Sequence, residues 1–200
     1  MMSTLRKLAF VPILLLAFTA CDQIGDPVAP LPSTADPLLG SLLGGNTVQG
    51  YTLVKDPILS LSGITSAVST GSVIGFGGGT ISLLGHTLTV PVGAVSSPTL
   101  FTMTVLPTGY VEVDLLATVN TLLGVLDLGS KGFIKPVPVT LTYARGTNVG
   151  THTDLKVLRI KSILGYGTYE VMPSTVDTIN KNVTAPLDHF SRYTLAYPAE

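Results

Sequence analysis

Apolar and polar residues alternate along the C-terminal two-thirds of the chain, and a period of two residues is typical of half-buried β-strands. The clearest case is a pair of strands, Thr80–Leu84 and His86–Val90, that meet at Gly85 and are expected to form a hairpin. Successive side chains of a strand point to opposite faces. Leu88 and Val90 are therefore expected to be buried, and the threonines between them to face outward.

The same alternation recurs downstream at short, regular intervals separated by Gly, Pro and Asn turns. The strands expected from it are Leu100–Leu106, Tyr110–Leu115, Val125–Leu128, Pro138–Tyr143, Leu155–Ile163, Thr168–Met172, Val176–Ile179, Val183–Ala185 and Phe190–Tyr197.

Two stretches do not follow the alternation. Residues 64–71 are small and polar and are expected to form a loop after a first strand that starts at Tyr51; residues 116–123 are expected to form a helical turn or a loop. Roughly ten short strands without a convincing amphipathic helix predict an all-β fold. We expect an antiparallel β-sandwich over residues 72–200, preceded by a strand and loop over 51–71.

The N-terminal segment has the pattern of a secretory signal. Arg6 and Lys7 supply positive charge, Leu8–Ala20 is mostly apolar, and small residues precede Cys21. The stretch is too short to span a membrane comfortably. Because the only cysteine follows at once, residues 1–20 resemble a bacterial lipoprotein signal peptide, which implies lipidation of Cys21. An ordinary cleaved signal and a short membrane anchor are the alternatives.

A lipidated Cys21 would hold the mature chain on the membrane of the cell envelope, since two or more acyl chains such as palmitate anchor a protein stably. The proline-rich residues 21–50 are then expected to form a tether or linker. With Cys21 modified, no thiol remains for a disulfide or for a cysteine nucleophile. With 11 basic and 12 acidic residues and no basic cluster, nucleic acid is a poor candidate partner.

Four short motifs occur in order along the expected sandwich: Gly77–Thr80, Leu88–Ala94, Gly132–Leu141 and Asp188–Tyr193. Together they resemble the ZU-five domain of ankyrins, netrin receptors and the death-domain protein PIDD, over about residues 72–197. The resemblance implies a β-sandwich that engages in protein–protein interaction. It does not identify a partner, because fold alone does not carry function.

The segment His189-Phe190-Ser191 is the sharpest chemical candidate. Its resemblance to PIDD-like members implies self-cleavage between Phe190 and Ser191, with Ser191 as nucleophile and His189 as general base. The structural alternative is that His189 lies at the start of a strand, Phe190 packs in the core and Ser191 is a small filler. Cleavage here would release only a short C-terminal peptide, which favours the structural alternative.

The other candidate groups give weaker signals. His86, His152 and His189 are too scattered for a local metal-ligand pattern, so no metal and no cofactor are expected. Glu112 and Asp114 share one face of a strand and could form a carboxylate pair for a glycosidase or for calcium. Solvated charges on an outer face are the simpler interpretation.

These observations predict a membrane-anchored envelope lipoprotein that displays a β-sandwich as a non-catalytic interaction or structural module with a protein partner. Such a module is expected to present a broad, sparsely charged face or loop surface and no small-molecule pocket. Self-cleavage is one alternative function. Carbohydrate or matrix binding is another, although the chain has no Trp for a sugar platform.

Overall fold

Strands dominate the fold, and most of them bury one face and leave the other exposed or half-buried. The computed structural model describes residues 47–58, 65–122, 124–163 and 166–200, all within one compact unit, Ser33–Glu200. The expected signal peptide, Cys21 and most of the expected tether lie outside the described residues.

The described residues form fourteen strands. Their bounds are β1 Thr47–Val48, β2 Tyr51–Leu53, β3 Val68–Ile74, β4 Gly79–Leu83, β5 His86–Val90, β6 Thr99–Val105, β7 Glu112–Thr121, β8 Gly124–Asp127, β9 Val137–Thr142, β10 Lys156–Ile163, β11 Tyr166–Val171, β12 Thr175–Asp177, β13 Asn182–Leu187 and β14 Arg192–Pro198.

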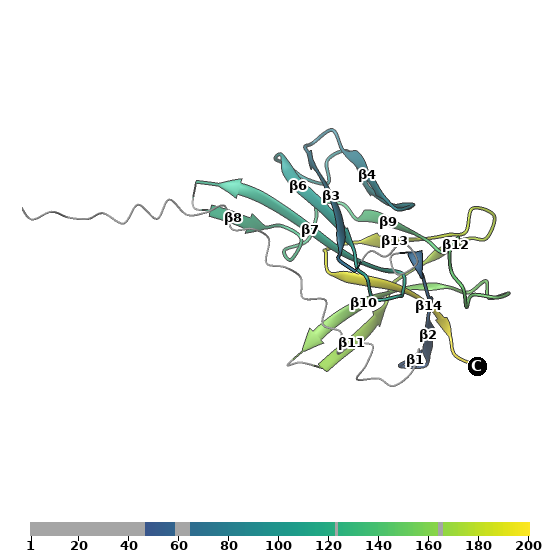
Figure 1. Ribbon diagram of the computed structural model, residues 1–200. Coiled ribbons are helices and arrows are strands. Elements are labelled where there is room, and N and C mark those ends of the chain that lie inside the picture. The colour runs from purple at the N-terminus through teal and green to yellow at the C-terminus, as the bar shows by residue number, and fades with distance from the viewer. Residues whose placement is uncertain (1–46, 59–64, 123, 164–165) are drawn as a thin grey trace, which may run out of the picture. The chain divides into compact units, whose positions relative to one another are not determined.

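The strands form two antiparallel sheets that pack as a sandwich (Figure 1). The larger sheet has the order β1-β2-β14-β7-β6-β3, with β8 paired to β7 and the β10–β11 hairpin paired to β14. The smaller sheet has the order β12-β13-β9-β5-β4. The prediction of an all-β antiparallel sandwich is confirmed.

The alternation correctly identifies the side chains that fill the space between the sheets. Leu88 and Val90 on β5 are buried, and so are Phe101, Met103 and Val105 on β6. The intervening threonines are half-buried or exposed. The hairpin predicted about Gly85 joins β4 to β5, with Ile81 opposite Leu88. The inward faces of both sheets thus form one continuous hydrophobic core.

The structure differs from the expected elements in three places. Residues 68–71, expected as the end of a loop, belong to β3, because the small residues of that strand pair with all seven residues of β6. Residues 116–121, expected as a helical turn or loop, continue β7 and pair with β6 and β8. The larger sheet begins at Thr47, within the expected tether, because β1 pairs with β2.

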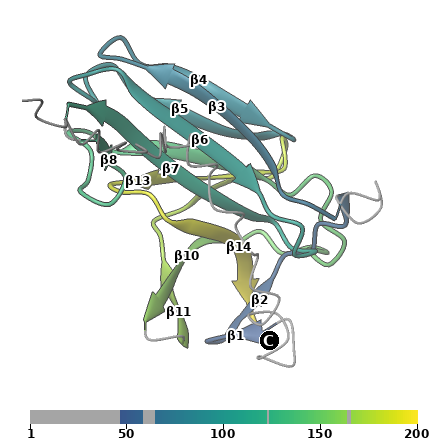
Figure 2. The same ribbon diagram turned by 60° about the vertical axis from the view of Figure 1, so that its left-hand side comes forward.

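Strand β14 connects the parts of the larger sheet. Its first residues pair with β7 along one edge and its last residues with β2 along the same edge, while β10 pairs along the other. Figure 2 shows the β10–β11 and β1–β2 hairpins on the two sides of β14. On the face turned away from the sandwich core these hairpins enclose a second, smaller hydrophobic cluster of Val48, Leu53, Leu158 and Ala196.

Candidate functional site

The expected self-cleavage segment lies in the bend that leads into β14. The Phe190 side chain is buried in the core, and its N–H donates to the Gly129 carbonyl oxygen at 2.8 Å. The Ser191 hydroxyl donates to the Ile160 carbonyl oxygen on β10 at 3.2 Å. The serine hydroxyl is therefore held by the neighbouring strand of the sheet.

His189 is held by its backbone. The buried Tyr193 hydroxyl donates to the His189 carbonyl oxygen at 2.7 Å, four residues back along the chain. Burial, and then the nearby Arg159, lower the pKa of His189, so its ring is neutral at neutral pH. Among the described residues, no hydrogen bond joins the His189 ring to the Ser191 hydroxyl. Self-cleavage between Phe190 and Ser191 stays a prediction.

The expectation that Glu112 is a solvated charge on the outer face is wrong. Glu112 does lie on the outer face of the larger sheet, opposite Thr194, but its relative exposure is only 8%. The Arg192 guanidinium lies 3.6 Å from its carboxylate. Burial raises the pKa of Glu112, and burial likewise raises the pKa of Asp114 two residues along.

Glu112 is buried because distant segments cover this part of the outer face. Leu158 on β10 lies opposite Thr194, and Leu53 on β2 lies opposite Ala196, so the small hydrophobic cluster continues the face on which Glu112 lies. Tyr110 and Tyr169 pack against the same cluster. Glu112 and Asp114 share Arg192 as a charged neighbour, which makes them part of a packed surface.

His86, at the start of β5, is fully buried, with a relative exposure of 0%. The Thr142 N–H donates to its Nδ1 at 3.2 Å, which places the ring proton on Nε2. Nε2 lies 3.4 Å from Arg145 Nη2. Burial and then the Arg145 charge lower the pKa of His86 to about 4, while Asp56 opposes them.

Arg145 joins three segments that are far apart in sequence. It contacts both carboxylate oxygens of Asp56, with Nη2 at 2.7 Å from Oδ2, and donates through Nη1 to the Leu84 carbonyl oxygen at 2.7 Å. The Asp56 side chain is 3% exposed. This network links the end of β9 to the β4–β5 turn and to the segment after β2, and its geometry indicates a structural role.

The three histidines lie in different parts of the structure. His86 is in the Arg145 network, His189 is in the bend before β14, and His152 stacks on Tyr197 with ring centroids 4.0 Å apart. Within the described ranges, no three His, Cys, Asp or Glu side chains are grouped to hold a metal ion. In the same ranges, no helix has the length and hydropathy needed to cross a membrane.

The four motifs behind the ZU-five resemblance meet at one end of the sandwich. The Gly93 N–H donates to the Phe76 carbonyl oxygen at 2.8 Å, and the Ile134 N–H donates to the Ala94 carbonyl oxygen at 3.2 Å. The Phe133 N–H donates to the Asp188 carbonyl oxygen at 2.8 Å. Backbone hydrogen bonds therefore hold together loops that are far apart in sequence.

Glycine is required in one of these loops. Gly78 has a φ of +72°, and a Cβ at this position would lie 2.5 Å from the Val90 carbonyl oxygen. The loop before β4 can therefore cross close over the end of β5 only with glycine here. Beneath the loops, three phenylalanine rings pack together, the closest pair being Phe133 and Phe190 with centroids 4.6 Å apart.

We call this part of the molecule the apolar end and define it by loops 75–78, 91–98 and 128–136 together with the tip of the β7–β8 hairpin. It carries exposed large hydrophobic side chains on each of these segments, and more lie on the outer sheet face beside it. These side chains account for eight of the ten that are exposed among the described residues: Phe76, Val92, Leu122, Val125 and Ile134 on the apolar end, and Val73, Leu100 and Leu116 beside it.

The distribution of charged residues along the sequence is a signal that could have indicated this surface. From Pro57 to Val111 the sequence contains no Asp, Glu, Lys or Arg, and this run supplies β3 to β6. The charged residues of the apolar end are Asp127, Lys131 and Lys135, and the exposed Asp188 lies beside it because its carbonyl oxygen accepts the Phe133 N–H. The Lys135 ammonium donates to the Val92 carbonyl oxygen at 2.7 Å, so it lies directly beside an exposed hydrophobic side chain.

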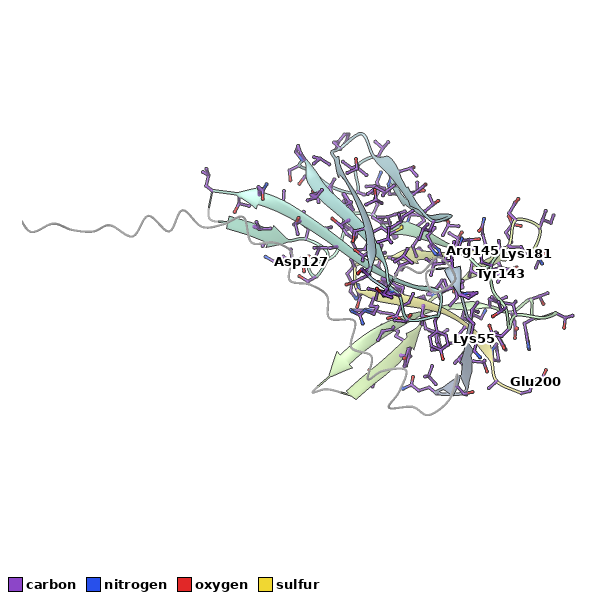
Figure 3. All side chains as sticks on the ribbon, viewed as in Figure 1. Lys55, Asp127, Tyr143, Arg145, Lys181 and Glu200 are labelled. Carbon is purple, nitrogen blue, oxygen red and sulfur yellow. The ribbon has the colours of Figure 1, made fainter. Side chains whose placement is uncertain are left out.

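The opposite end of the sandwich is charged. Figure 3 shows Arg145, Tyr143 and Lys181 together at that end and Asp127 on the other side of the molecule. The Tyr143 N–H donates to the Lys181 carbonyl oxygen at 2.8 Å, and the Lys181 ammonium lies 5.8 Å from the centre of the Tyr143 ring. The opposite end therefore presents charged side chains together with one highly exposed hydrophobic side chain, Ile179.

A comparison of the chain with models of protein families found no match, and a search of curated proteins found no similar sequence. The class that the structure defines is an all-β antiparallel sandwich with one sparsely charged, apolar end.

Proposed function

We propose that this chain is a lipoprotein of the bacterial cell envelope. Fatty acids on Cys21 would anchor it, and its β-sandwich would be displayed as a non-catalytic interaction or structural module. The apolar end carries the proposal, since exposed hydrophobic side chains gathered in one region mark an interaction surface.

Two further features support this function. The order of apolar, small and cysteine residues over 1–21 supports anchoring at Cys21. Three buried polar groups have structural contacts: Asp56 and His86 contact Arg145, and the Tyr193 hydroxyl donates to the backbone before β14. An open groove lies beside the apolar end, lined by Val73, Pro98, Leu100 and 118–121.

We also propose that the sandwich is of the ZU-five type. The support is that the motif segments of this resemblance, which are short and dispersed in sequence, are joined by backbone hydrogen bonds at one end of the fold. Interaction through that end would fit the protein-binding role that the resemblance implies.

The experiment that tests the anchor is an intact-mass measurement on the protein extracted from the membrane fraction of a bacterial host. We expect a chain that begins at Cys21 and carries the added mass of acyl groups. The matched control is Cys21→Ser, which is expected to retain its signal segment or to leave the membrane without added mass. An unmodified mature chain in the soluble fraction of the wild-type culture would refute the anchor.

The same mass spectrum also tests the alternative function, self-cleavage between Phe190 and Ser191. If the function is non-catalytic, wild type and Ser191→Ala show one chain that ends at Glu200. A wild-type product that ends at Phe190 and is missing from Ser191→Ala would replace the proposed function with self-processing.

A further inference from the structure

We infer that the apolar end of the sandwich contacts the lipid bilayer, with Phe76, Leu122 and Val125 inserted among the lipid headgroups and upper acyl chains. This inference rests on the proposed function, because the anchor at Cys21 is what would hold the domain at the membrane. It assigns the bilayer itself as the partner of that surface.

The first argument is the way in which the hydrophobic side chains are presented. Leu122, at the tip of the β7–β8 hairpin, is fully exposed, Val125 is 70% exposed and Phe76 is 66% exposed. They project from two separate segments, the β7–β8 hairpin and the loop before β4, and none of the three lines the open groove beside them. Separate apolar tips suit a deformable lipid phase, whereas a protein partner favours a packed hydrophobic centre with complementary shape.

The second argument is the distribution of charge. Loops 75–78 and 91–98 and residues 115–126 contain no charged side chain, so their burial in the interface would desolvate no ionised group. Lys131 and Lys135 follow on the next loop, and the Lys135 ammonium lies at Val92. Lysines that flank apolar tips can reach lipid phosphates, and this arrangement is typical of proteins that bind a membrane surface.

The third argument is the length of the chain that precedes the domain. Roughly two dozen residues separate Cys21 from Thr47, and a chain of that length can span at most about 90 Å. A chain of that length is long enough to allow the apolar end to face the membrane that holds the anchor. Tethering keeps the bilayer at a high effective concentration. The lipid-bound orientation of the domain would therefore be populated even if the apolar end binds lipid only weakly.

Tryptophan fluorescence gives a direct test, because the chain has no Trp. The single-tryptophan variant Leu122→Trp of the full chain is purified with its native lipid anchor and reconstituted into phosphatidylethanolamine–phosphatidylglycerol vesicles, with and without brominated acyl chains. The matched control is Ile179→Trp, because Ile179 is also highly exposed (90%) but lies on the turn after β12, away from the apolar end. Phe76→Trp provides a second reporter on an independent loop.

We expect brominated lipid to reduce the emission of Leu122→Trp and Phe76→Trp by about twofold and to leave Ile179→Trp unchanged. Equal emission of Leu122→Trp and Phe76→Trp in plain and brominated vesicles would overturn the inference. A blue-shifted emission that bromine does not quench, together with crosslinked pairs of the chain, would also overturn it and would assign the apolar end to a second copy.

This experiment tests the lipid anchor and the bilayer contact independently of each other. Intact mass of the same samples reports acylation. An acylated chain without quenching would refute the bilayer contact and leave the lipoprotein proposal standing. A chain without acyl groups would refute the anchor, and quenching of Leu122→Trp on addition of that chain to the same vesicles would still support the contact.

Discussion

The buried imidazole of His86 makes a quantitative prediction about acid stability. The pKa of His86 falls from its ordinary value of 6.5 to about 4, first because the ring is buried and then because Arg145 is close. The unfolded chain therefore binds a proton at this residue in a pH range in which the folded chain does not. The stability that the neutral ring supplies is complete above pH 6.5 and is lost as the pH falls toward 4.

The size of this loss follows from the shift. One pKa unit corresponds to about 1.4 kcal/mol, so a fall from 6.5 to about 4 represents roughly 3 kcal/mol of unfolding free energy at pH 4. A domain is typically stable by about 5–15 kcal/mol, so one residue would remove a large part of the total. Protonation of Nδ1 would also remove the acceptor of the Thr142 N–H, which lies 3.2 Å away.

The assay is urea unfolding followed by circular dichroism at several pH values from 7 to 4, on wild type and His86→Asn. The asparagine amide oxygen can accept the Thr142 N–H but does not titrate. The lowered pKa of His189 acts in the same direction as His86, and the raised pKa of Glu112 acts in the opposite direction. Both are present in each protein, so the difference between the two pH profiles isolates His86.

We expect wild type to lose roughly 3 kcal/mol more than His86→Asn between pH 7 and pH 4. An independent measurement is the NMR titration of the His86 ring, whose midpoint is expected near pH 4. Parallel stability profiles for the two proteins, or a midpoint near 6.5, would refute the reasoning.

Three other substitutions test the packing. Arg145→Met is expected to cost about 3 kcal/mol in the same urea assay, because the Asp56 carboxylate would stay buried without its cation; an unchanged unfolding midpoint would contradict this. Glu112→Gln is expected to raise the free energy of unfolding at neutral pH, since burial raises the pKa of Glu112 and disfavours its ionised form. The variant is also expected to lose less stability than wild type as the pH rises. A pH profile identical to that of wild type would contradict this. Leu88→Asp is expected to prevent folding, whereas Thr89→Asp on the exposed face of β5 is tolerated, and resistance to limited proteolysis distinguishes the two outcomes.

The alternation of apolar and polar residues was sufficient to predict many of the residues that line the core. Leu88 on β5, Phe101 on β6, Leu141 on β9 and Leu195 on β14 all point into the sandwich as the alternation indicates. This information is local, because a strand's geometry alone sends alternate side chains to opposite faces. The turn residues between these strands likewise carried enough information to predict an antiparallel all-β fold.

Strands whose residues have weak preferences could not be predicted in the same way. Residues 68–74 are mostly Ser, Thr, Gly and Val, and they form β3 because β6 offers a complete row of hydrogen-bonding partners. Residues 116–121 extend β7 for a similar reason, since β6 and β8 lie on either side. In both places the partner strand decides the conformation.

The sequence by itself determined the alternation of core and surface positions, the all-β fold and the N-terminal pattern that predicts an anchor at Cys21. Only the tertiary structure decided that Glu112 is buried, that His86 lies beside Arg145, and that hydrophobic tips from four separate segments gather at one end. The physical reason is that the two-residue alternation determines which face of a strand a side chain occupies. Whether that side chain is buried depends on the segments that cover the face. In this chain those segments come from strands that are distant in sequence, such as β2 and β10 beside β14.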